Sequence, residues 1–237
     1  MISVVDFHSH ILPGIDDGSD SVEQSVAMLR MEAEQGIRTV VATPHFYARR
    51  DNLQSFLERR AQAEQLLKSE MRSHSGLPEV LIGAEVRYYS GISNSDAISN
   101  LVIGDTKYIL IEMPHTAWTE EMYQELENIH AKQGLTPIVA HIDRYISPWR
   151  SHGIPKRLAQ LPVLVQANGE FFQNRHTASL AIRMLRDGKI HLLGSDCHGT
   201  SSRKPNLADA LAVICKRLGP ETVAAINRRE QRVLTGK

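Results

Sequence analysis

Short apolar runs rich in β-branched residues recur along the chain, separated by longer stretches that mix polar and apolar positions. Seven such runs occupy residues 3–7, 39–42, 80–84, 108–111, 137–140, 163–167 and 190–195. Runs of this length and composition are typical of buried strands. Strands that alternate with helical patterns predict a parallel sheet. We therefore expect an α/β barrel, irregular or incompletely closed.

The stretches between the runs carry helix start and stop signals. The predicted helices cover residues 20–35, 51–73, 119–133, 175–187 and 206–218, with a short last helix from residue 221. Asp20 and Glu23 have the spacing of a capping box at the start of the first helix. A glycine directly follows several predicted helices, as expected of helix C-termini: Gly36, Gly134, Gly188 and Gly219.

Residue types that bind metals follow the apolar runs. The first run leads into His8-Ser9-His10 and the last into Asp196-Cys197-His198. Four further runs lead, directly or within a few residues, to His45, Glu85, Glu112 and His141. The run at residues 163–167 is the exception, since the residue that follows it, Asn168, is neutral. Because the C-terminal ends of parallel barrel strands share one mouth, we expect these side chains to converge there.

Two of the strand ends carry paired candidates. A strand repeats every two residues, so His8 and His10 share one face, as do Asp196 and His198, whereas Cys197 faces away. A single polar residue at a strand end is more often an ordinary cap. The recurrence of such ends in one chain argues instead for a common site.

A loop carboxylate adds to this set. We interpret Asp17 as a ligand, whereas Asp16 is explained as well by a turn or a helix cap. The candidate ligands are then His8, His10, Asp17, His45, Glu85, Glu112, His141, Asp196 and His198. They exceed the roughly four to six donors that one ion needs, and their mixture of imidazole and carboxylate suits a cluster of Mn, Fe, Zn or Mg. Adjacent metals favour phosphoester hydrolysis, because they acidify a bridging water and clamp the attacking and leaving oxygens.

Arginines complete the candidate chemistry. Arg144 and Arg203 each follow a strand-end histidine by a few residues. The planar, permanently charged guanidinium suits phosphate; the alternative is a solvated loop arginine. We expect Arg49 and Arg50 at the surface.

Composition narrows the function classes. The 237 residues suit one domain over residues 1–237, and Lys+Arg 27 balance Asp+Glu 27, so bulk charge does not favour nucleic acid or an acidic membrane. The two cysteines give no disulfide framework, and the sequence has no secretory leader or apolar run of about 20 residues. We expect a cytoplasmic protein without membrane insertion. A G-x-S-x-G elbow and a phosphate loop that would support covalent catalysis are also missing from the sequence.

Five stretches resemble the PHP (polymerase and histidinol phosphatase) superfamily, and within it the bacterial manganese-dependent protein-tyrosine phosphatases of capsule and exopolysaccharide loci. The resemblance runs in order along nearly the whole chain. It rests on DFHSHILPGIDDG at residues 6–18, TVVATPHF at 39–46, GAEVRYY at 83–89, PIVAHIDRY at 137–145 and LLGSDCHG at 192–199.

This resemblance implies a distorted (β/α)7 barrel with three divalent metal ions, manganese above all, at the C-terminal strand ends. One metal would take His8, His10 and Asp196, with Glu85 as a bridge. A second would take Glu85, Glu112 and His141, and a third Asp17, His45 and His198. It also implies that Arg144 and Arg203 bind the phosphoryl group.

The resemblance further implies hydrolysis of phosphotyrosine by a metal-activated water, on the tail of a membrane tyrosine autokinase. A PHP phosphatase acting on a small metabolite such as histidinol phosphate would have the same metal site and stays open. An amidohydrolase-type barrel commonly has a carboxylated lysine on a middle strand, whereas Glu85 and Glu112 end these strands here. A degenerate scaffold should have lost ligands, and none is missing from the sequence. A homo-oligomer also stays open.

Overall fold

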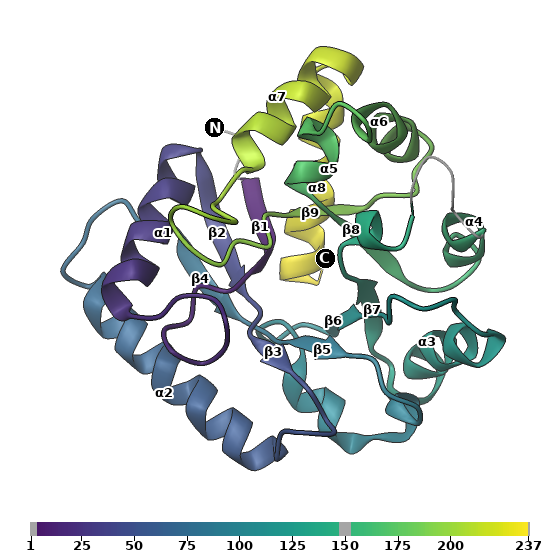
Figure 1. Cartoon of the computed structure of the whole chain (residues 1–237), viewed down its shortest axis with the longest axis horizontal. Coiled ribbons are helices and arrows are strands. Elements are labelled where there is room, and N and C mark those ends of the chain that lie inside the picture. Colours follow the sequence, from purple (N-terminus) through teal and green to yellow (C-terminus); the bar gives the residue numbers. More distant parts are fainter. Residues whose placement is uncertain (1–3, 147–152, 237) are drawn as a thin grey trace.

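The computed structural model describes residues 4–146 and 153–236; Ser3, where the first predicted strand begins, lies outside them. Its strands are β1 Val4–Ser9, β2 Ile37–Ala42, β3 His45–Phe46, β4 Glu79–Ile82, β5 Glu85–Arg87, β6 Tyr108–Glu112, β7 Thr136–Val139, β8 Leu164–Asn168 and β9 Leu192–Gly194. They pair in parallel, in the orders β1-β2-β4 and β3-β5-β6-β7-β8-β9. Figure 1 shows these strands curled at the centre, with helices around them.

Two of the predicted strands, at residues 39–42 and 80–84, each continue after a short break in a further short strand, so that each forms one divided strand. Thr43 and Pro44 separate β2 from β3, and Pro44 has no N–H to donate to a strand ladder. Gly83 and Ala84 separate β4 from β5. With each divided strand counted once, the described residues contain the seven strands that were predicted. A parallel bridge between Ser9 and Cys197 joins the end of β1 to the segment after β9, so the distorted (β/α)7 barrel is confirmed.

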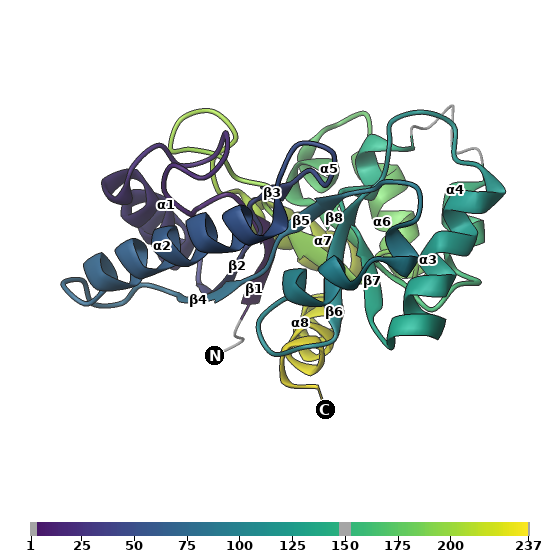
Figure 2. The ribbon, with the colours of Figure 1, turned by 90° about the horizontal axis from the view of Figure 1, so that it is seen from below.

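The helices surround this sheet. They are α1 Val22–Glu34, α2 Leu53–Met71, α3 Glu120–Gln133, α4 Ile154–Leu158, α5 Gly169–Gln173, α6 Ala178–Arg186, α7 Leu207–Leu218 and α8 Pro220–Thr235, with short 3-10 helices η1 Ile92–Asn94, η2 Asp96–Leu101 and η3 Ile142–Arg144. Figure 2 shows α8 on the opposite side of the barrel from the loop that joins β1 to α1. None of the helices in the described ranges is both long and apolar enough to span a lipid bilayer.

The first capping box was predicted one residue too early. Ser21 is the N-cap of α1, and its side chain accepts a hydrogen bond from the backbone N–H of Gln24. The Gln24 side chain in turn accepts from the N–H of Asp20 at 2.7 Å. Both pairs satisfy the same spacing rule, so the sequence pattern alone did not separate them. The last helix, α8, has 16 residues and is not short, and α4 and α5 were not predicted.

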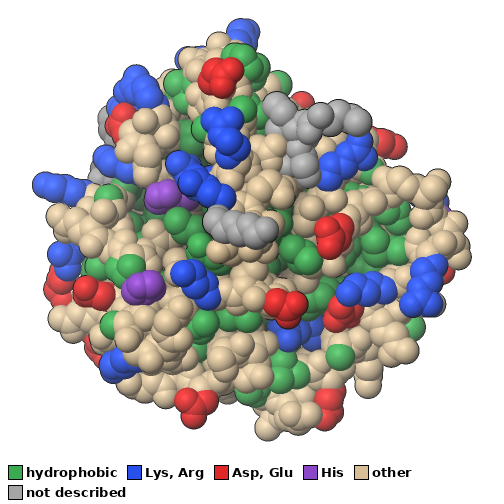
Figure 3. All heavy atoms as spheres, turned by 180° about the vertical axis from the view of Figure 1, so that it is seen from behind, with side chains coloured by type: hydrophobic (Ala, Val, Ile, Leu, Met, Phe, Trp, Pro, Cys, Tyr) green, Lys and Arg blue, Asp and Glu red, His purple; other side chains and the backbone are tan. Residues whose placement is uncertain are grey.

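The barrel interior is filled by apolar side chains. Val5, Phe7, Val41, Leu110 and Ile138 form one buried cluster with their neighbours. Each such side chain contributes about 1.5–3 kcal/mol by its removal from water. Close packing of this interior fixes the positions of the polar strand ends next to it. Figure 3 shows basic and acidic side chains interspersed on the face turned away from the view of Figure 1.

Candidate active site

The predicted ligands lie together at the C-terminal mouth of the barrel. The first strand end places two imidazoles side by side, with Nε2 of His8 3.2 Å from Nε2 of His10. Oε2 of Glu85 lies 3.2 Å from the first of these nitrogens and 3.4 Å from the second. Oδ1 of Asp196 lies 3.5 Å from both. The structure therefore brings together the first predicted ligand set, with all four residues buried.

The second set shares Glu85 with the first. Oε1 of Glu85 lies 2.8 Å from Nε2 of His141, which is 4.0 Å from Oε1 of Glu112. The two oxygens of one carboxylate thus face two groups of donors. This arrangement suits the bridging role predicted for Glu85.

The third set lies nearer to solvent. Oδ1 of Asp17 is 3.3 Å from Nε2 of His45 and 3.6 Å from Nε2 of His198. The His10 and His198 ring centroids are 3.9 Å apart, so His10 adjoins this group as well as the first. Nδ1 of His45 also lies 2.9 Å from Oε2 of Glu85. The three sets are therefore one continuous cluster of donors.

The donor atoms fit divalent metal ions. Glu85 Oε2, His45 Nδ1 and His198 Nε2 are buried, yet none makes a well-formed hydrogen bond among the residues that the structure describes, although the first two lie 2.9 Å apart. Buried polar atoms without a partner are rare in folded proteins. Imidazole and carboxylate donors are the ligands that Mn, Fe and Zn accept. Within the described part of the chain, groups of these residues have ligand atoms within 4.8 Å of one another.

Burial and charge act against each other in this cluster. Burial alone would lower the pKa of His8, but the carboxylates of Glu85 and Asp196 raise it. Despite their own burial, the pKa values of both carboxyl groups lie well below the usual range, because of His8 and the adjacent imidazoles. Burial and the nearby charge of His10 lower the pKa of His198 to about 4. At neutral pH the carboxylates are ionised and His198 is neutral, the forms that bind metals, whereas the raised pKa of His8 means that metal binding there would displace a proton.

Left-handed backbone marks the same site. The non-glycine residues with positive φ in the described ranges are His141 at 32°, Asp196 at 53° and Arg203 at 46°. Each such conformation costs about 1–3 kcal/mol and persists only where neighbouring contacts hold it. The N–H of Asp196 donates to the carbonyl of His8 at 2.7 Å, and the carbonyl of Arg203 accepts from His198 at 2.8 Å. Three candidate site residues are thus held in conformations that the free chain disfavours.

The two predicted arginines both contact one ligand. Arg144 donates to Oδ2 of Asp196, and Arg203 donates to Oδ1 of the same residue at 2.8 Å. Burial would lower the pKa of Arg144, but Asp196 and the other carboxylates raise it. A third arginine was not predicted: Arg87 donates to Oε2 of Glu112 at 3.0 Å.

Sequence reasoning also missed an amide pair on β8. Oε1 of Gln166 accepts from the N–H of His141 at 2.6 Å and lies 3.3 Å from Nδ1 of His8. Its amide donates to Asn168, which donates to Oδ2 of Asp196 at 3.1 Å. The pair thus orients three candidate ligands. The signal was the period of two along this strand, which puts Gln166 and Asn168 on one face.

Asp16, interpreted above as a turn or cap, orients ligands as well. Its Oδ2 lies 2.7 Å from Nδ1 of His10 and accepts from the N–H of His45 at 3.0 Å. Its other oxygen accepts from the N–H of Gly18, so the turn interpretation is correct in part. A Cβ at Gly18 would lie 2.2 Å from the His10 carbonyl oxygen, so only glycine fits this tight turn. Despite burial, His10 and these N–H groups lower the pKa of Asp16 to about 2.

Comparison with known proteins shows that the chain belongs to the family described as "Capsular polysaccharide synthesis, CpsB/CapC", whose model matches residues 4–234. Tyrosine-protein phosphatase YwqE of Bacillus subtilis is 30% identical over 225 residues, covering 92% of this chain and 86% of YwqE. Tyrosine-protein phosphatase CpsB of Streptococcus agalactiae serotype III is 28% identical over 228 residues, or 92% of each chain.

A solved structure gives the same result. It comes from work on YwqE of Bacillus subtilis and CpsB of Streptococcus pneumoniae, described as unique metal-dependent tyrosine phosphatases. Its TM-score is 0.86 at 26% identity, covering 99% of this chain and 95% of that one. The predicted family and fold are confirmed, and the relatives belong to the predicted enzyme class.

Proposed function

We propose that this protein is a metal-dependent protein-tyrosine phosphatase that hydrolyses phosphotyrosine side chains. The observation that carries the proposal is the convergence of imidazoles, carboxylates and arginines at one barrel mouth. His8, His10 and Glu85 lie within 3.4 Å of one another there. The family of the chain and the names of its relatives support the same activity.

The predicted ligands would hold three divalent ions, and we propose manganese. When bound, such ions lower the pKa of water and neutralise charge on the phosphoryl oxygens. The protein's part is to keep the carboxylates ionised and fixed in place. Glu85 would serve two ions at once, while Asp16 and Gln166 hold the imidazoles of His10 and His8 in orientation.

Arg144 and Arg203 would bind the phosphoryl oxygens. Each guanidinium has five N–H donors in a fixed plane, and each uses part of them on Asp196. The remaining donors can face a phosphoryl group beside that carboxylate. Donors held in position before the reaction stabilise charge that develops in the transition state.

The physiological substrate that we propose is the phosphotyrosine tail of a membrane tyrosine autokinase in capsule or exopolysaccharide synthesis. The family description supports the link to capsular polysaccharide. We also propose that the protein is one PHP domain over residues 1–237 and acts in the cytoplasm.

The test compares substrates in protein of known metal content. Purified protein is demetallated, reloaded with Mn²⁺ and assayed with a phosphotyrosine peptide and with histidinol phosphate. We expect activity to return with the metal and kcat/KM to be higher for the peptide. Full activity without metal would refute the mechanism. A higher kcat/KM for histidinol phosphate would support the small-metabolite alternative instead.

A further inference from the structure

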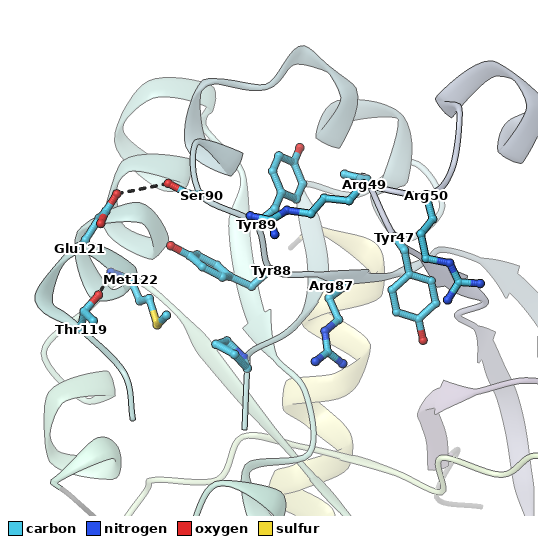
Figure 4. Close-up of a pocket in the computed structure, with 12 residues that line it drawn as sticks. Tyr47, Arg49, Arg50, Arg87, Tyr88, Tyr89, Ser90, Thr119, Glu121 and Met122 are labelled. Carbon is cyan, nitrogen blue, oxygen red and sulfur yellow. Dashed lines mark hydrogen bonds between the residues drawn. The ribbon is translucent and has the colours of Figure 1, made fainter. Parts of the chain in front are cut away.

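A pocket adjoins the mouth of the barrel. It has a volume of about 510 Å³, and its walls include Tyr47, Arg49, Arg50, Tyr88, Tyr89 and Met122. This volume lies in the range of sites that enclose a whole small ligand, so it exceeds what one phosphoryl group needs. Figure 4 shows the arginine side chains and Tyr47 on one side, and Glu121 with Ser90 on the other.

The strands that position the candidate ligands also lead into this pocket. β3 begins at His45, and Tyr47 follows it with its ring centroid 5.3 Å from that imidazole. β5 runs from Glu85 to Arg87, which lines the pocket and donates to Glu112. Tyr47 and Arg87 therefore link the pocket to the candidate ligands His45 and Glu112.

The pocket walls combine apolar and cationic surface. Tyr88, Tyr89 and Met122 are partly exposed and give the apolar part. Arg50 lies over the Tyr47 ring, 5.1 Å from its centroid, which leaves guanidinium edges for an anion. Figure 4 shows Arg49 extended toward Tyr89.

The charges in the pocket favour an acidic ligand. Arg49 and Arg50 are both exposed, whereas Arg87 is paired with Glu112. The carboxylate of Glu121 accepts a hydrogen bond from Ser90 at 3.3 Å on the opposite wall. An anionic group would therefore meet two guanidinium groups on one side and an apolar surface beside them.

We propose that this pocket binds the polypeptide segment next to the phosphotyrosine of the substrate protein. An acidic side chain of that segment would contact Arg49 and Arg50, and an aromatic or aliphatic side chain would pack on Tyr88 and Met122. The inference rests on the proposed function, because it assigns this pocket to the recognition of a protein substrate. It makes Arg49 and Arg50 specificity residues that do not touch the reacting phosphate.

The experiment uses the metal-loaded enzyme and three substrates: p-nitrophenyl phosphate, a phosphotyrosine peptide with acidic flanks, and the same peptide with lysine flanks. In the R49A/R50A variant, KM for the acidic peptide should rise about tenfold, the size expected for loss of two partly solvated charge contacts. The rate with p-nitrophenyl phosphate should stay within about twofold. The R49E/R50E variant should reverse the preference and favour the lysine peptide.

A matched control removes two exposed arginines outside the pocket. Arg38 and Arg217 are exposed and are not among the pocket residues, so R38A/R217A should leave all three substrates unchanged. A Met122→Ala variant tests the apolar wall and should raise KM only for peptides with an apolar flanking residue.

Equal KM values for both peptides in the wild type and in R49E/R50E would overturn the inference. If the proposed function itself is wrong, the outcome differs: the enzyme would hydrolyse p-nitrophenyl phosphate but neither peptide.

Discussion

Glu85 faces His141 with one carboxylate oxygen and His8 with the other, at 2.8 Å and 3.2 Å. The side chain is buried, and its Oε2 makes no well-formed hydrogen bond within the described part of the chain, although it lies 2.9 Å from Nδ1 of His45. Removing a carboxylate from water costs free energy, which the surrounding imidazoles offset here, as the low pKa of Glu85 shows. The two oxygens thus face different groups of donors, which supports the bridging role proposed for Glu85.

Glu85→Ala should abolish turnover and lower the metal content, because two groups of donors lose their shared carboxylate. The metal-free variant should still fold, since the barrel core is apolar. Elemental analysis, kcat and urea unfolding measure the three effects. Glu79→Ala at the start of β4 removes an exposed carboxylate and should change none of them. A Glu85→Ala enzyme with full metal loading and wild-type kcat would contradict the assignment.

Local patterns predicted the strands and the ligand types at their ends. The period of two in His8-Ser9-His10 was enough to predict that both imidazoles meet, and they lie 3.2 Å apart. The partners that orient the ligands were not predictable in this way. Gln166, on the neighbouring strand β8, accepts a hydrogen bond from the N–H of His141. The left-handed backbone of Asp196 depends on its hydrogen bond to β1. The period of two places Gln166 and Asn168 on one face, but their partners on other strands are set only when the barrel closes.

Asp16→Asn should weaken metal binding about 10- to 100-fold, the cost usual for loss of a carboxylate that orients a metal-binding histidine. The amide would keep the volume but lose the charge that lies 2.7 Å from Nδ1 of His10. Isothermal titration of metal-free protein with Mn²⁺ measures the change. Asp20→Asn, an exposed position in the same loop, is the control and should bind as the wild type does. An unchanged affinity for Mn²⁺ would show that Asp16 only stabilises the turn.

Arg144→Ala should lower kcat/KM by about 2–4 kcal/mol in activation free energy, as expected for loss of one preorganised donor to the transition state. The metal content should stay the same, because Arg203 still donates to Asp196 at 2.8 Å. Steady-state kinetics at verified metal occupancy separate the two effects. If the variant loses metal while its remaining holoenzyme keeps normal kinetics, Arg144 has only a structural role.

Glu230 on α8 predicts a pH-dependent stability. Burial raises its pKa to about 8, above the ordinary 4.5, although the N–H of Val5 donates to it at 3.4 Å. The unfolded chain therefore ionises this group at lower pH than the folded protein does. Its contribution to stability is favourable at low pH, falls as the pH rises from 4.5 to about 8, and then levels off.

Glu230→Gln cannot ionise and should therefore lose this pH dependence. At pH 8 the variant should be more stable than the wild type, by about 3–5 kcal/mol at most. Urea unfolding of metal-free protein at pH 5, 6.5 and 8 measures the difference between the two proteins. Glu221→Gln, exposed on the same helix, should show the wild-type pH dependence. A constant difference between Glu230→Gln and the wild type over this range would show that Glu230 does not titrate as stated.

Cys197→Ser should keep most of the activity, because the thiol faces away from the site. The side chain is fully buried, and its Sγ lies 3.9 Å from Oε1 of Glu32. Burial and the nearby acidic groups raise its pKa well above the ordinary value, so the nucleophilic thiolate is disfavoured. Alkylation should modify the exposed Cys215 without inhibiting the enzyme.

The same reasoning predicts that water attacks phosphorus directly. Oxygen-18 from solvent should then enter phosphate in one step with inversion at phosphorus. A trapped phosphocysteine at Cys197, or retention with a chiral phosphate ester, would instead require a covalent thiol mechanism.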